Sequence, residues 1–104
     1  MKTEDLQITE EQTQSGIKFT IKGHVNSATA EKLEDSLKKA LKDGKVNIIL
    51  NMVWVKFLSS AGIRIILKTY QEATDAGGKL GIEMPSQNVR NVLGMTALDE
   101  MLIH

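Results

Sequence analysis

A nearly continuous apolar run, VNIILNM at residues 46–52, constrains the fold of this chain more than any other feature. A strand of this composition is typical of the centre of a sheet that is covered on both faces. An amphipathic helix pattern lies on each side of the run, at residues 27–44 and 61–78, and a second apolar strand, KLGIEM, follows at residues 79–84. Strand–helix–strand alternation implies right-handed crossovers and a largely parallel sheet.

The segment before the first helix predicts an antiparallel hairpin over residues 5–23. Ile17, Phe19 and Ile21 alternate with lysine and threonine, and TQSG supplies the turn between the two strands. This alternation is typical of strands with one face in the core and one in water. The hairpin therefore makes the sheet mixed rather than wholly parallel.

Each helix carries its own start and stop signals. Ser27 can cap the first helix, and Gly44 stands where a glycine commonly ends one. The first helix is expected to bury Ala30, Leu33, Leu37, Ala40 and Leu41. The second is expected to bury Ile63, Ile66, Leu67, Tyr70 and Ala73, with VWVKFLSS before it as a loop and a Gly-Gly pair after it.

The C-terminal quarter predicts one more helix and one more strand. The strand at residues 79–84 should turn Leu80, Ile82 and Met84 inward. Pro85 and Ser86 break this strand and start a short helix that Gly94 ends, and the final EMLIH is expected to form a short edge strand. We therefore predict an α/β fold, a single domain over residues 1–104, with a mixed β-sheet in the order β-β-α-β-α-β-α-β and amphipathic helices packed on it.

The sequence lacks the residue types and motifs that most kinds of active site require. The chain has no cysteine, and its two histidines, His24 and His104, belong to no ligand-spaced motif. Neither glycine-rich phosphate-binding pattern occurs, and FLSSAGI differs from the G-x-S-x-G motif of hydrolases. We predict a protein that is not an enzyme and that uses no catalytic residue, metal or cofactor.

Charge and hydropathy exclude further partners. Thirteen basic and thirteen acidic residues give a formal net charge of +0, so there is no basic excess that would neutralise a nucleic acid. The start, MKTEDLQITEEQ, has no apolar signal segment, and no apolar run approaches the ~20 residues that span a bilayer. We expect a cytoplasmic protein, monomeric when free, that binds neither nucleic acid nor membrane.

Two adjacent serines stand at the start of the second helix, in FLSSAGIRIIL at residues 57–67. One of Ser59 and Ser60 is expected to cap the helix, which leaves the other hydroxyl free. The first turn has no acidic residue, Ala61 and Gly62 are small, and Arg64 follows Ser60 by four residues. A phosphate on Ser60 would therefore meet an uncompensated helix N-terminus and an arginine. A caps-only role for both serines remains the alternative.

At this point the chain resembles a STAS domain of the bacterial anti-sigma factor antagonist family. The resemblance covers nearly the whole chain and rests on five segments in order: GHVN at residues 23–26, AEKLEDSLKKAL, IILNMVWVKFLSSAGIRIIL, AGGKLGI and NVRNVLGMTALDEMLIH. It implies a partner-switching module that binds an anti-sigma factor serine kinase and so releases a sigma factor. The kinase would phosphorylate the serine that begins the second helix, and a PP2C-type phosphatase would reset the system.

By motif alignment the resemblance makes Ser60 the phosphoacceptor, with Ser59 as a rival. Relatives often carry Asp at the position of Ser59 and at that of Asn51, which is expected to end the central strand. The loss of both carboxylates makes this loop less acidic than in such relatives.

The partner-binding residues expected here are Asn26, Trp54, Ser59, Ser60, Gly62 and Arg64. Trp54 is either an interface anchor or a plug at the end of the core, and Asn26 is either a contact residue or a turn residue that bonds its own backbone. Two other functions stay open: a STAS module of another assembly, such as a stressosome-like scaffold, and a small-ligand or nucleotide-binding domain.

Overall fold

The computed structural model describes residues 6–95 of the 104-residue chain. Within them the chain forms four strands and three helices: β1 (Leu6–Gln12), β2 (Ile17–Val25), α1 (Ala30–Lys42), β3 (Asn47–Leu58), α2 (Ser60–Asp75), β4 (Lys79–Glu83) and α3 (Gln87–Met95). The predicted order is confirmed through the third helix. The strand predicted at EMLIH lies outside the described residues.

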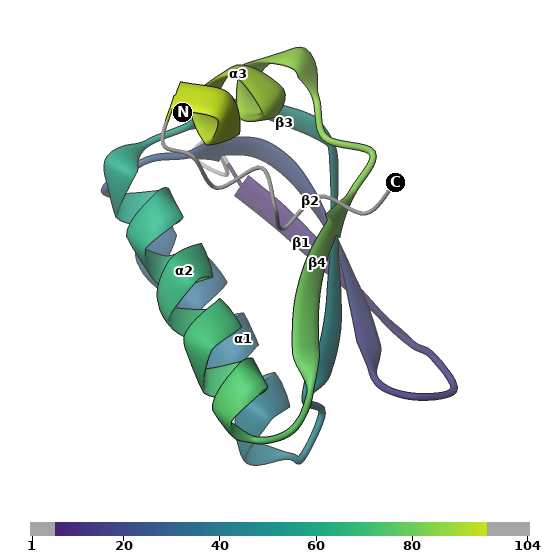
Figure 1. Cartoon of the computed structure of the whole chain (residues 1–104). Helices are drawn as coiled ribbons and strands as arrows, with labels where there is room; N and C mark the ends of the chain where they lie inside the picture. The colour runs from purple at the N-terminus through teal and green to yellow at the C-terminus, as the bar shows by residue number, and fades with distance from the viewer. Residues whose placement is uncertain (1–5, 96–104) are drawn as a thin grey trace.

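The strands form one mixed sheet in the order β1-β2-β3-β4. β1 and β2 are the predicted antiparallel hairpin, whereas β2 and β3 run parallel, as do β3 and β4. In Figure 1, α1 and α2 lie side by side along one face of the sheet, and α3 lies near the end of β3. The parallel strands therefore direct their carboxyl ends, and the helix starts that follow them, to the same edge.

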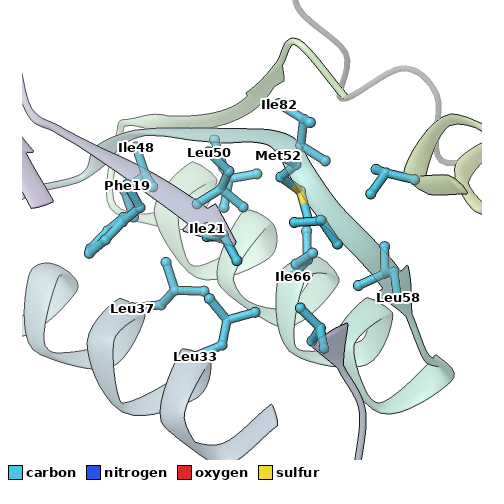
Figure 2. Close-up of a cluster of buried hydrophobic side chains, with 14 of the residues drawn as sticks. Phe19, Ile21, Leu33, Leu37, Ile48, Leu50, Met52, Leu58, Ile66 and Ile82 are labelled. Atoms are coloured by element: carbon cyan, nitrogen blue, oxygen red, sulfur yellow. The ribbon is translucent and has the colours of Figure 1, made fainter. Parts of the chain in front are cut away.

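The core lies between the sheet and the helices. Figure 2 shows side chains from β2 and β3, among them Phe19, Ile21 and Leu50, directed toward Leu33 and Leu37 of α1. All five are fully buried. Burial of a side chain of this size contributes roughly 1.5–3 kcal/mol, so the sheet–helix interface is the main source of stability.

The prediction that the central strand is covered on both faces is wrong. Ile48, Leu50 and Met52 are buried, whereas Ile49 and Asn51, which alternate with them, are half-buried. Both α1 and α2 pack on the same face, and no helix of residues 6–95 covers the other face of the strand (Figure 1).

β3 is also longer than predicted, because residues 53–58 continue the strand instead of forming a loop. The pairing of β2 with β3 shifts register twice, and each shift adds one extra residue to β3. The buried positions therefore change from every second residue to every third, at Met52, Val55 and Leu58. Such bulges break the alternation of buried and exposed residues by which a strand is predicted from its sequence. Because β3 continues to Leu58, Asn51 lies inside the strand and does not end it as predicted. Its side-chain oxygen accepts a hydrogen bond from the Val53 N–H at 3.1 Å.

The start of α1 differs from the prediction, but its end does not. Ser27 is exposed and is not the cap, because the chain coils through a tight turn before the helix and Thr29 occupies the N-cap position. The Ala30 N–H bonds the Asn26 carbonyl at 2.8 Å, which closes this turn. At the other end Gly44 has φ +82°, the left-handed conformation expected of a glycine that ends a helix.

Two further predictions near the C-terminus are wrong. Met84 is 59% exposed instead of inward-facing, because β4 ends at Glu83 and Met84 leaves it with φ 50°. Gly94 lies within α3, which continues to Met95, the last described residue. The predicted start of α3 holds, since the Ser86 hydroxyl oxygen accepts a hydrogen bond from the Val89 N–H at 3.2 Å.

Candidate functional site

The two serines lie at the carboxyl edge of the sheet, where β3 leads directly into α2. The Ser59 N–H donates to the Val25 carbonyl at 2.8 Å, which fixes the serine pair beside the last residue of β2. Because β2 and β3 are parallel neighbours, the turn that begins at Asn26 lies at the same edge. Two strand-to-helix junctions thus share one end of the molecule.

The structure divides the work of the two serines. Ser59 has extended backbone angles (φ −84°, ψ 171°), and its hydroxyl oxygen accepts a hydrogen bond from the Gly62 N–H at 3.3 Å. Ser59 is therefore the N-cap of α2. Ser60 is the first helical residue and is exposed, and within residues 6–95 its hydroxyl has no hydrogen-bond partner.

Gly62, the second of the two small residues after the serine pair, is buried. A Cβ atom at this position would collide with side-chain atoms of Val25 and Leu58. The first turn of α2 therefore packs directly on the ends of β2 and β3. The backbone comes so close to these strands that only glycine fits at this position. Gly62 shapes the site by fixing the helix start, and it offers a partner no side-chain surface.

The N-terminus of α2 is electrostatically uncompensated. Its first turn contains no acidic residue, whereas the first turn of α1 contains Glu31. Arg64 is exposed and follows Ser60 by four residues, about one turn further along α2. A helix N-terminus carries roughly half a positive charge, so a negative group on Ser60 would be stabilised here.

Asn26 is the turn residue of the neighbouring junction. Its side-chain oxygen accepts hydrogen bonds from the N–H groups of Ala28 at 2.9 Å and Thr29 at 3.0 Å. Its own N–H donates to the Thr29 hydroxyl at 2.9 Å. Asn26 thus bonds the backbone of its own turn and lies half-buried at this edge. The strand before it extends through Val25, so GHVN is mostly strand and turns only at its last residue.

Trp54 does not plug the core, because 59% of its surface is exposed. It stands in β3 rather than in a loop, in register with Lys22 of β2. Phe57, two residues before Ser59, is 48% exposed and in register with His24 of β2. The exposure of Phe57 was not predicted from the sequence. The only signal for it was that the alternation of apolar and polar residues breaks down after Met52.

Away from the serine pair, the described residues form a surface cavity, but they contain no metal-binding group and no membrane-spanning helix. A surface cavity of about 190 Å³ opens at the far end of α1, between Lys39, Asp43, Lys45 and Glu10, away from the serines. No group of acidic or histidine side chains in residues 6–95 is arranged to hold a metal ion. No helix in the same range is long and apolar enough to cross a membrane.

Comparison with known proteins gives a family and a fold. A model of the STAS domain family matches residues 7–104. BtrV of Bordetella bronchiseptica, which is named as an anti-sigma factor antagonist, is 32% identical over 72 residues, or 69% of this chain. The chain spans 62% of the length of that relative.

Solved structures of similar proteins share the fold at low identity. An anti-sigma factor antagonist from Mycobacterium paratuberculosis superposes with a TM-score of 0.84 at 21% identity, over 98% of this chain and 87% of the other. SpoIIAA, a Bacillus cell-fate determinant and anti-sigma factor antagonist, is 20% identical in two solved forms. Its unphosphorylated form gives a TM-score of 0.82, over 93% of this chain and 86% of SpoIIAA, and its phosphorylated form gives 0.76, over 93% and 89%.

Proposed function

This chain belongs to the STAS domain family, and on that premise we propose that it is an anti-sigma factor antagonist switched by phosphorylation of Ser60. Unphosphorylated, it binds an anti-sigma factor that is also a serine kinase, and the sigma factor held by that kinase is released. The kinase phosphorylates Ser60 and the complex dissociates, and a PP2C-type phosphatase restores the binding state. The relative named as an antagonist and the two solved phosphorylation states of SpoIIAA support this assignment.

The observation that carries the proposal is the division of work between the serines. Ser59 caps α2, so its hydroxyl oxygen already serves the helix. Ser60 is exposed and its hydroxyl is unengaged within residues 6–95, so a kinase can reach it without opening the fold. Modification of Ser59 instead would disturb the cap.

The switch needs no refolding. A phosphoserine carries close to two negative charges at pH 7, and the N-terminus of α2 stabilises such a group in the free protein. The same charge becomes unfavourable when a partner covers it, because a hydrated anion loses its water without gaining a matched cation. Local desolvation and repulsion therefore separate the partners while the antagonist stays folded.

The partner is expected to cover the carboxyl edge of the sheet. Ser60 and Arg64 are exposed on the first turns of α2, and Asn26 lies half-buried at the end of β2. Arg64 would pair with an acidic group of the kinase in the complex and with the phosphate after modification. In this proposal the antagonist itself contributes no catalytic residue and acts as a monomer.

The direct test is phosphorylation by the anti-sigma factor kinase of the same genome. The purified chain is incubated with this kinase and ATP, and intact mass is measured for the native protein, Ser60→Ala and Ser59→Asp. We expect the mass of one phosphate on the native chain and on Ser59→Asp, which keeps an N-cap oxygen, and none on Ser60→Ala. A phosphate that persists in Ser60→Ala would overturn the assignment of the acceptor.

Binding provides the second measurement. Ser60→Asp is expected to bind the kinase at least tenfold more weakly than Ser60→Asn, a neutral variant of the same size. Equal affinity of these two variants would exclude a charge-based switch at this position, even if the kinase transferred phosphate to it.

A further inference from the structure

Two exposed aromatic side chains lie on the bulged half of β3, turned away from the core. Met52, Val55 and Leu58 fill the buried positions of this half, while Trp54 and Phe57 are 59% and 48% exposed. In the parallel pairing with β2, Trp54 stands beside Lys22 and Phe57 beside His24. We call Trp54, Phe57, Lys22, His24 and Lys56 the β3 aromatic surface.

Backbone carbonyls of β3 beneath this surface are hydrogen-bonded to residues at the start of α3. β4 pairs with β3 only as far as Asn51, and beyond that point the start of α3 satisfies the open edge of the strand. The Ser86 N–H and hydroxyl donate to the carbonyls of Met52 at 3.1 Å and Val55 at 2.6 Å. The Asn88 side-chain amide donates to the Lys56 carbonyl at 2.5 Å. With these carbonyls occupied, a partner is expected to engage the side chains rather than add a strand to the edge.

Charge on the surface is one-sided. Lys22 and Lys56 are exposed, and within residues 6–95 neither forms an ion pair. Lys18, further back on β2, differs, because Glu83 lies 2.5 Å from its amine and the hydrogen bond between them raises the pKa of Lys18. The aromatic side chains are thus bordered by unpaired positive charge in a chain whose formal net charge is +0.

We propose that the β3 aromatic surface is a docking site for an acidic protein segment whose apolar side chains cover Trp54 and Phe57. Aromatic side chains bury much area at little entropic cost, and unpaired lysines at the border select acidic partners. A second copy of this chain is disfavoured, because two such surfaces would bring lysines against lysines. A nucleic acid is disfavoured because two lysines and one histidine neutralise few phosphates. The site goes beyond the proposed function, since its use requires no kinase and no phosphate.

Trp54 is the only tryptophan of the chain, so its fluorescence reports the proposed contact directly. The probe is a synthetic amphipathic peptide with Glu and Asp on one face and Leu and Phe on the other. Two matched peptides replace either the acidic residues with Lys or the apolar residues with Ser. We expect a saturable blue shift of Trp54 emission with the first peptide alone.

Two sets of variants test where the peptide binds. Lys22→Glu/Lys56→Glu is expected to weaken binding at least tenfold, and Phe57→Ala at least fivefold, while both retain the fluorescent probe. Lys42→Glu/Lys79→Glu changes the net charge equally at exposed positions outside the surface and should leave affinity unchanged. Equal weakening by the two lysine pairs would reduce the effect to net charge and overturn the proposal.

The remaining outcomes also decide between occupants. No blue shift with the acidic peptide, or an equal shift with its basic counterpart, refutes the acidic partner. A blue shift that grows with protein concentration in the absence of peptide would assign the surface to a second copy. Quenching of Trp54 by a poly-dT oligonucleotide at affinity equal to that of the peptide would assign it to nucleic acid.

Discussion

The β2–α1 and β3–α2 junctions at the carboxyl edge of the sheet differ in how fully their polar groups are satisfied. At the β2–α1 junction, the Asn26 side chain accepts two backbone N–H groups. The Thr29 hydroxyl accepts from the Asn26 N–H at 2.9 Å and donates to the His24 carbonyl at 2.7 Å. Glu31 in the first turn compensates the helix dipole. The Asn26 and Thr29 side chains of this junction are therefore both engaged in holding the fold.

The β3–α2 junction has much less local bonding. A single side-chain cap joins Ser59 to Gly62, and the first turn has no acidic residue. Ser60 is exposed, and its hydroxyl has no partner within residues 6–95. The β4–α3 junction also lacks an acidic first turn, but its Ser86 both caps the helix and donates to Val55. Of the helices that follow these three junctions, only α2 begins with a hydroxyl-bearing residue, and within residues 6–95 that hydroxyl is unengaged.

The largest effect is expected from Gly62→Val, which tests whether close packing fixes the β3–α2 junction. The added side chain must displace Val25 and Leu58, so we expect the free energy of unfolding to fall by about 3 kcal/mol in urea denaturation. Gly94→Ala is the matched control, because Gly94 is exposed within α3 and a Cβ there meets nothing within 4 Å. That variant should be stabilised by about 0.5–1 kcal/mol. Destabilisation of both to the same extent would remove the special role of Gly62.

Asn26→Ala tests the fully bonded junction. It removes the acceptor of two backbone N–H groups, each worth about 0.5–1.5 kcal/mol, so we expect a loss of about 2 kcal/mol in the free energy of unfolding. Asn26→Asp keeps the accepting oxygen and should stay close to the native value. The free energy of unfolding of both variants is measured by thermal or urea denaturation. An Asn26→Ala variant as stable as the native protein would show that these side-chain hydrogen bonds do not stabilise the turn.

Ser59→Ala tests the single cap of α2. It should cost about 1 kcal/mol, half as much as Asn26→Ala, because only one N–H group loses its partner. Ser59→Asp restores an accepting oxygen and should recover native stability. If Ser59→Ala were as destabilising as Asn26→Ala, the two junctions would not differ in the way their hydrogen bonds indicate.

The regular elements could be predicted because their periodicity is local. The hairpin, both long helices and the β4 strand followed from alternation or helical spacing, and the serine pair was found from its place before an apolar stripe. The bulges of β3 could not be predicted, since they depend on how β2 pairs with β3 across the sheet. This is why Trp54 and Phe57 were not recognised as an exposed pair on a strand.

Which serine caps the helix was equally beyond local reasoning. Both Ser59 and Ser60 have the chemistry of a cap. The choice is made by the hydrogen bond from the Ser59 N–H to Val25, which sets the residue at which β3 ends. The roles proposed for Ser60 and Arg64 in partner binding stay predictions.

The smallest effect is expected from Ser60→Asp in the free protein, and its sign is the informative part. A carboxylate at the first position of α2 meets an uncompensated dipole, so we expect stabilisation by about 0.5 kcal/mol over Ser60→Asn, measured by urea unfolding at low ionic strength. The gain should shrink in 1 M salt, where the Debye length falls to about 3 Å. A second acidic residue at the start of α1, introduced as Ala28→Asp beside Glu31, should gain less, because that dipole is already compensated. A destabilising Ser60→Asp would mean that a charge at this position harms the fold itself, and phosphorylation could not then act on binding alone.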